Sequence, residues 1–244
     1  SFDYQWLFDR VHTLKKEVEK EKITNGTVVV LEADFSPTAL ALLLVLIDLG
    51  CIIVPLTSSV ESQKEEFIKI AEGEILLKLD DDDNLKIKKT PHKVSHEFIN
   101  ELKNRGHPGL VLFSSGSTGK SKASLSDFSD ILNKFKVPRH SLRTIAFLLF
   151  DHIGGINTLL YTLSNAGCVV AINDRTPENV LRAIDKYKVE LLPTSPTFIN
   201  LILLSEAYKR YQLSSLKTVT YGTEPMPETT LKKFHKLFPE IQLK

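Results

Sequence analysis

The chain has 244 residues, a hydrophobic fraction of 42% and a formal net charge of +1. This length suffices for one large or two ordinary domains with a real core. A charge so near zero offers no positive field, so neither nucleic acid nor an anionic membrane surface is an expected partner. In the most apolar stretch, residues 35–56, the uncharged part before Asp48 is too short to span a bilayer, and Gly50 and Pro55 then interrupt the stretch.

The two cysteines, Cys51 and Cys168, each follow a glycine and open a Val/Ile run. Both are predicted to be small buried residues at strand starts, and neither a disulfide nor a metal site is expected from them. Charged residues interrupt the first ten positions, so no signal peptide is expected there. These features favour a reducing, cytoplasmic location.

The first part of the chain alternates predicted helices and strands. Ser36 is a predicted N-cap with Pro37 at the first helical position, and Ser58 with Glu61 forms a possible capping box. The alternation is typical of a parallel sheet with helices on its faces. The predicted helices span residues 3–22, 37–49 and 58–71, and the predicted strands span residues 27–31, 51–54 and 110–113.

Residues 74–89 differ, because two short apolar and basic runs flank an acidic segment that begins at Asp80. Four adjacent acids can bind a cation, but a solvated turn is the interpretation that we favour. His92, His96 and His107 follow, and we assign them no role, since no cysteine or acid pair completes a zinc-binding set. No metal ligand is therefore predicted.

The second part continues the alternation. Residues 144–150 form an unbroken apolar run, which predicts a central strand ending at the turn Asp151–Gly155. Thr176 and Ser195 each precede a proline and predict helix starts. The predicted helices cover residues 127–135, 156–165, 177–187 and 195–208 and a last segment ending at 238, and the further strands cover residues 168–172, 189–192, 217–221 and 241–244.

We therefore predict an α/β fold with layered, parallel-rich β-sheets and helices on their faces. Two approximate lobes are expected, residues 1–135 and 136–244, with sheets that can interleave.

The segment Ser114–Lys122 carries the strongest chemical signal. It follows the apolar run 110–113 and contains two glycines, five hydroxyl residues and two lysines. Glycines bring backbone N–H groups close to a ligand, successive N–H groups form a concave anion site, and the lysines add positive charge. The segment predicts a polyphosphate site, with a solvated Ser/Gly loop as the alternative. A Walker A loop would need glycine where Ser114 stands, so a P-loop phosphotransferase is disfavoured.

Three polar turns follow predicted strands, at residues 114–122, 151–155 and 222–227. Ligands of open α/β sheets bind beyond the carboxyl ends of the strands, so we expect the three turns to form one site. His152 alone is more often a structural loop histidine, but its place between a strand and two glycines favours a functional role.

Ser114–Lys122 resembles the Ser/Thr/Gly-rich phosphate loop of the adenylate-forming superfamily, which includes AMP-forming acyl-CoA synthetases, peptide-synthetase adenylation domains and luciferases. The usual loop ends Gly-x-Pro-Lys-Gly, and here Ser121 replaces the proline and Ala123 the last glycine. Phe150–Gly155 resembles the family's turn beside the acyl substrate, and Pro193–Thr197 resembles the segment that starts the following helix.

Residues 222–226 resemble the family's Gly-Gly-Glu/Ala-Pro-Leu turn, with Thr223 in place of the second glycine. A side chain at this position is expected to crowd the adenine or the substrate carboxylate.

The resemblance implies an incomplete N-terminal domain of an enzyme that joins a small carboxylic acid to ATP as acyl-AMP, with release of pyrophosphate. A thiol, that of CoA or of a carrier protein, then displaces AMP. A Glu that helps hold Mg²⁺ is expected beyond Lys244, as is a small C-terminal domain, so the piece alone is expected to be inactive. The alternative is a non-catalytic nucleotide-binding or degenerate family member.

The resemblance also assigns residues. Lys122 and Thr118 are the implied catalytic residues. The implied contacts to the ATP phosphates are Ser114, Ser115, Gly116, Ser117, Thr118, Gly119, Lys120 and Lys122. The implied substrate and adenine pocket contains His152, Gly222, Thr223, Glu224 and Pro225.

Overall fold

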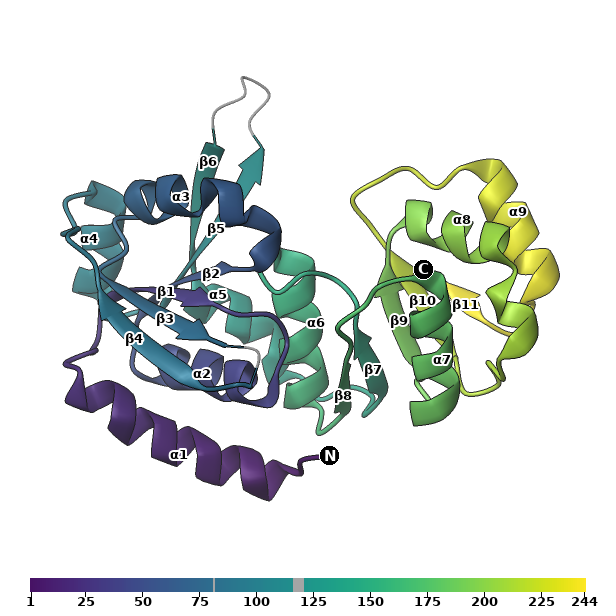
Figure 1. The fold of residues 1–244 in the computed structure, drawn as a ribbon, viewed down its shortest axis with the longest axis horizontal. Coiled ribbons are helices and arrows are strands. Elements are labelled where there is room, and N and C mark those ends of the chain that lie inside the picture. The colour runs from purple at the N-terminus through teal and green to yellow at the C-terminus, as the bar shows by residue number, and fades with distance from the viewer. Residues whose placement is uncertain (81, 116–120) are drawn as a thin grey trace. The chain divides into compact units, whose positions relative to one another are not determined.

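The computed structural model describes residues 1–80, 82–115 and 121–244, with the backbone alone of Ser115. The chain folds as two compact units, each described here by itself. The first unit comprises Ser1–Lys136 with Phe150–Ile153, and the second comprises Val137–Leu149 with Gly154–Lys244. Both are α/β units with parallel-rich sheets, which confirms the predicted fold class (Figure 1).

A six-stranded sheet in the order β4-β3-β1-β2-β5-β6 forms the first unit. Its inner strands run parallel, and the edge strands β4 and β6 are antiparallel to their neighbours. The strands are β1 Val28–Glu32, β2 Ile52–Leu56, β3 Ile75–Leu79, β4 Leu85–Lys89, β5 Gly109–Ser115 and β6 Ser121–Asp127.

Helices cover both faces of this sheet. Figure 1 shows α1 and α2 on one side and α3 and α4 on the other. Side chains of α3 and α4 form one apolar cluster with alternate residues of β1 and β2, as expected for a strand buried on both faces. The helical segments are α1 Tyr4–Lys20, α2 Pro37–Asp48, a 3-10 turn Ser58–Gln63, α3 Lys64–Ile70, α4 Glu97–Arg105, α5 Phe128–Asn133 and a 3-10 turn Lys134–Lys136.

A five-stranded parallel sheet in the order β11-β10-β9-β7-β8 forms the second unit. Its core joins the strands to apolar side chains of α7, α8 and α9. The elements are β7 Arg143–Ala146, α6 Ile153–Ser164, β8 Cys168–Ala171, α7 Pro177–Tyr187, β9 Leu191–Thr194, α8 Pro196–Ser205, a 3-10 turn Ala207–Arg210, β10 Thr218–Tyr221, α9 Glu228–Leu237 and β11 Gln242–Leu243.

The helix starts predicted from a hydroxyl residue before proline are confirmed. The side chains of Ser36, Thr176 and Ser195 each accept a backbone N–H three residues on, and each following proline opens the helix. The capping box predicted at Ser58 and Glu61 is wrong. A 3-10 turn precedes α3, and neither segment has a side-chain cap, because the Glu61 carboxylate pairs with Lys64 at 2.6 Å.

The apolar run predicted as one central strand divides between the two units. Strand β7 ends at Ala146, and the Phe147 ring packs in the second unit at 4.2 Å from the ring of Phe198. Phe150 is fully buried in the first unit, with its ring edge-on to Phe35 at 5.2 Å. The run is continuous because it supplies two cores, and the strand prediction was four residues too long.

The acidic turn between β3 and β4 has structural partners. The Asp80 carboxylate accepts the N–H groups of Asp82 and Asn84. Asp83 reaches the start of α2, where its carboxylate accepts the Ser36 hydroxyl and the Thr38 N–H. A negative charge at a helix N-terminus is favourable, so Asp83 ties the hairpin to α2 and the prediction of a merely solvated turn was incomplete.

Four elements were not predicted, among them the strands β3 and β4 on either side of the acidic turn. Helix α4 lies within the segment that we had left without structure, and His96 is its N-cap, with Nδ1 accepting the Phe98 N–H at 3.3 Å. Strand β6 occupies residues that we had assigned partly to the phosphate loop.

Of the two cysteines, Cys51 is buried as predicted, whereas Cys168 is exposed because β8 is an edge strand. Among the helices described, none has the length and apolar character needed to cross a membrane.

Candidate functional site

The residues at both ends of the predicted phosphate loop belong to strands. Ser114 on β5 is directly opposite Lys122 on β6, and Ser115, the last residue of β5, is opposite Ser121, so both ends of the segment are paired antiparallel strands. This part of the prediction was wrong because β6 is polar and lacks the β-branched residues that mark a strand. The predicted phosphate contacts Gly116, Ser117, Thr118, Gly119 and Lys120 lie outside the described residues.

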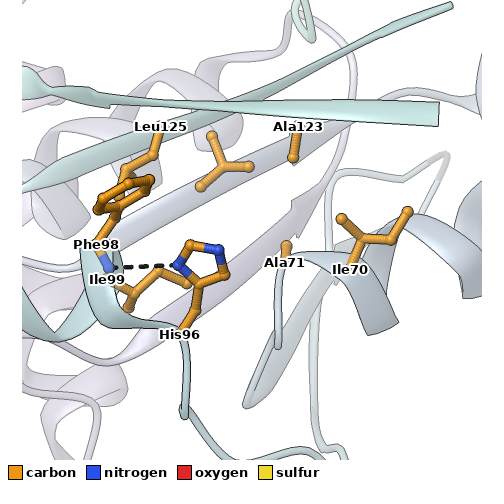
Figure 2. A pocket seen from close by; sticks show the side chains of 8 residues that line it. Ile70, Ala71, His96, Phe98, Ile99, Ala123 and Leu125 are labelled. Carbon is orange, nitrogen blue, oxygen red and sulfur yellow. Dashed lines mark hydrogen bonds between the residues drawn. The ribbon is translucent and has the colours of Figure 1, made fainter. Parts of the chain in front are cut away.

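Ser114 and Lys122 are both exposed and share one face of the hairpin, because directly opposed residues of an antiparallel pair point the same way. The opposite face is apolar. There Ala123 and Leu125 line a pocket of about 270 Å³ with residues of α3 and α4, and His96 stands at its centre (Figure 2). The sheet therefore separates this apolar pocket from the side chain of Lys122.

Two other lysines of the first unit, Lys64 at the start of α3 and Lys78 near the end of β3, have a carboxylate partner. Glu32 ends β1, is only 9% exposed, and pairs with both Lys64 and Lys78. Lys122 has no carboxylate partner among the residues that the structure describes. The charges of Lys64 and Lys78 are compensated by Glu32 and Glu61.

His152 lies in a short turn that docks on the first unit. Its neighbour Asp151 is 6% exposed, and the Asp151 Oδ2 accepts both the N–H of Thr57 at 3.2 Å and its hydroxyl at 2.7 Å. The Thr57 hydroxyl also lies 2.7 Å from that of Ser59. The His152 side chain is 59% exposed, with Nε2 3.8 Å from the Asp151 Oδ1.

This docking brings two of the predicted turns to one edge of one sheet. Thr57 follows β2, and β2 pairs in parallel with β5, which leads into the phosphate segment at Ser114. His152 therefore reaches the carboxyl edge of the first sheet through the Thr57–Asp151 contact, and not from the end of a strand of its own as predicted. Sequence reasoning missed Thr57 and Asp151, although a single acid directly after a long apolar run was an available signal.

The third predicted turn, Gly222 to Pro225, follows β10 in the second unit. Thr223 has φ of +70°, a left-handed conformation that a β-branched residue rarely adopts, and its hydroxyl donates to the Gly222 carbonyl at 2.6 Å. The Glu224 carboxylate accepts the hydroxyl of Thr197. Strands β9 and β10 pair up to their last residues, so the two segments that resemble the adenylate-forming family are in direct contact within this unit. A single site shared with the first unit stays a prediction.

The glycine pair after His152 has a structural explanation. A Cβ on Gly155 would lie 2.0 Å from the Leu149 carbonyl oxygen, so helix α6 can pack against this backbone only through a glycine. A Cβ on Gly154 would meet only the tip of the Leu148 side chain, at 2.8 Å. Gly155 is thus required by packing whether or not a ligand binds nearby.

Within residues 1–80, 82–115 and 121–244, no cluster of three or more His, Cys, Asp or Glu side chains could hold a metal ion. These residues therefore do not fit a metal centre of their own.

Comparison with curated protein sequences finds CoA ligases and CoA ligase-like proteins among the relatives. The chain is 28% identical over 149 residues to 4-coumarate–CoA ligase-like 9 of Arabidopsis thaliana, covering 57% of this chain and 26% of that protein. It is 26% identical over 136 residues to the indoleacetate–CoA ligase of Aromatoleum aromaticum, covering 53% and 27%. The chain thus spans about a quarter of the length of these relatives.

Solved structures match almost the whole chain. The luciferase-like enzyme of the nonluminescent mealworm Zophobas morio has a TM-score of 0.73 at 21% identity, covering 98% of this chain and 64% of that one. The inhibitor-bound N-terminal domain of FACL13 from Mycobacterium tuberculosis has a TM-score of 0.80 at 13% identity, covering 98% and 67%. At these identities the likeness establishes the fold. The family model described as AMP-binding enzyme matches residues 24–244, and the chain therefore belongs to the AMP-binding enzyme family.

Proposed function

We propose that the protein containing this chain is an ATP-dependent acid–thiol ligase of the acyl-CoA synthetase type. The carboxylate oxygen of the acid attacks the α-phosphorus of ATP, the bond to the β-phosphate oxygen breaks, and acyl-AMP and pyrophosphate form. A thiol, that of CoA or of a carrier protein, then attacks the acyl carbon and AMP leaves. The family match over residues 24–244 carries this proposal, and the CoA ligases among the relatives support it.

In this proposal the β5–β6 hairpin holds the triphosphate. Backbone N–H groups of residues 116–120 and the hydroxyl of Thr118 contact the β- and γ-phosphates, and Lys122 stabilises the charge that develops on them. The exposure of Lys122 and its lack of a described carboxylate partner support this role. Positive charge fixed where negative charge develops is among the largest catalytic contributions.

The acid and the adenine take the remaining predicted residues. His152 lines the pocket of the carboxylic acid, and the turn from Gly222 to Pro225 contacts the adenine and the substrate carboxylate. The Thr197–Glu224 hydrogen bond supports a fixed geometry for that turn. Because the described residues do not fit a metal centre, no step here is assigned to Mg²⁺.

The test is acid-dependent ATP–pyrophosphate exchange by the full-length product, over a panel of aromatic and aliphatic carboxylic acids. Lys122→Ala is expected to slow exchange roughly a hundredfold, the usual loss for one preorganised charge-stabilising group. Lys93→Ala, at an equally exposed lysine of the first unit, is the matched control and should exchange at the wild-type rate. Equal exchange by the two variants would remove Lys122 from the site.

The 244-residue chain on its own is expected to give no exchange, because solvent-exposed phosphate contacts are weak compared with those of a closed site. Robust exchange by the chain alone would show that the whole catalytic apparatus lies within residues 1–244.

A second candidate is a nucleotide-binding family member without catalysis. The strained Thr223, where the related enzymes carry glycine, favours it. Calorimetric binding of ATP by the full-length product, without pyrophosphate exchange for any acid in the panel, would establish this alternative.

A further inference from the structure

We propose that Asp151 is a positioning residue that orients the ring of His152, by accepting a hydrogen bond from Nε2–H on its Oδ1. The use of the oriented ring to contact a carboxylic acid rests on the proposed function. The orientation itself is a property of the fold. It depends on Thr57, Asp151 and His152, which all belong to the first unit.

Two hydrogen bonds from Thr57 fix the position of the Asp151 carboxylate. Asp151 is 6% exposed, and both hydrogen bonds from Thr57 arrive at one of its oxygens, Oδ2. A backbone N–H and a hydroxyl together fix the carboxylate plane. Phe150, the residue before Asp151, is fully buried beside Phe35 and fixes the backbone there. The position of Asp151 is therefore set before His152 is considered.

The other carboxylate oxygen of Asp151, Oδ1, lacks a donor among the described residues. Asp151 Oδ1 is buried and accepts no hydrogen bond from any described residue. A buried carboxylate oxygen without a donor is costly, and buried polar atoms in native proteins nearly always have a partner. An anchor alone would need only Oδ2, so Oδ1 requires a separate explanation.

The imidazole of His152 can supply the donor for Oδ1. His152 Nε2 lies 3.8 Å from the Asp151 Oδ1, which is beyond hydrogen-bond distance. Closing that gap requires a movement of about 1 Å, to the normal N–H···O separation. The imidazole is 59% exposed and can rotate. Bonding through Nε2 selects one tautomer of the neutral ring and leaves Nδ1 directed away from Asp151, toward a ligand.

The direct test measures the tautomer on this chain and does not depend on activity. Long-range proton–nitrogen NMR at pH 8 distinguishes the two neutral tautomers, and the His152 signals are identified by their loss in His152→Ala. We expect the Nε2–H tautomer to predominate in the wild type and to lose that predominance in Asp151→Asn. Asp130→Asn, at an exposed acid of α5, is the matched control and should change nothing. An unchanged tautomer in Asp151→Asn would overturn the proposal.

The second test is a double-mutant cycle in the full-length product, with the KM for the acid and the kcat of pyrophosphate exchange measured separately. Asp151→Asn keeps an oxygen acceptor for Thr57 and replaces the acceptor that faces His152 by an NH2 donor. We expect Asp151→Asn and His152→Ala each to raise the KM about tenfold, the effect of one lost hydrogen bond, and the double variant to be no worse than either.

Multiplying effects in the double variant would show that Asp151 acts independently of His152, and would overturn the coupling. A wild type with no exchange for any acid would count against the proposed function, while the tautomer measurement would still decide the orientation.

Discussion

Replacing Gly155 by alanine is expected to destabilise the second unit by about 2 kcal/mol. The added Cβ would lie 2.0 Å from the Leu149 carbonyl oxygen and 2.8 Å from its carbon, where contacts under 3.0 Å essentially never occur. To remove this clash, α6 and the backbone at Leu149 must move apart by roughly 1 Å. A backbone, unlike a side chain, has no alternative rotamer that would avoid the contact. Such overpacking costs up to about 3 kcal/mol, and the better helix propensity of alanine returns about 1 kcal/mol.

The matched control is Gly154→Ala, one residue earlier in the same helix. Its Cβ would meet only the Leu148 Cδ1 at 2.8 Å, which a small rotation of that side chain removes. We expect the midpoint urea concentration for unfolding of this variant to equal that of the wild type or to lie slightly above it. The measurement is urea unfolding followed by circular dichroism, with a common slope for all variants. Equal stabilities for the two variants, or a larger loss for Gly154→Ala, would refute the packing explanation of the glycine pair.

Three further predictions concern other parts of the fold. Thr223→Gly should raise the free energy of unfolding by about 1 kcal/mol, because φ of +70° is strained for threonine and not for glycine, and urea unfolding checks it. Burial raises the pKa of the Cys51 thiol to about 12, so a thiol reagent at pH 8 should label only Cys168 in the native chain. In denaturant it should label both cysteines, and mass spectrometry measures both results. Labelling of Cys51 in the native chain would contradict this prediction. Hydrogen bonds from Lys217 and the Arg143 N–H hold the pKa of Glu190 below its ordinary value of 4.5. The ionised Glu190 therefore stabilises the fold above pH 4.5, and this stability is lost as the pH falls through the lower pKa of the folded state. Glu190→Gln should make the melting temperature fall less steeply below pH 5, and an unchanged slope would contradict the prediction.

The helix starts at a hydroxyl residue before proline and most of the apolar strands were predictable because their causes are local. A hydroxyl before a proline both caps a helix and fixes its first backbone angle, which is why Ser36, Thr176 and Ser195 could be placed from sequence. The resemblance to adenylate-forming enzymes was likewise contained in short stretches of sequence, and the family match confirms it.

Strand β6 could not be predicted because its cause is a partner strand. A polar segment becomes a strand here because the antiparallel ladder with β5 satisfies its backbone groups, and nothing in its own side chains requires that. The same ladder decided that Lys122 lies opposite Ser114 and shares its face, which a loop prediction leaves open.

The position of His152 was decided by tertiary structure alone. Its turn is held by the bond between Asp151 and Thr57, residues 94 positions apart, and by Phe150 in the core of the first unit. A run of apolar residues specifies that its side chains are buried, but not which of two cores receives each one. That choice depends on which cavity each ring fills and which donor each buried carboxylate meets, and both are properties of the assembled fold.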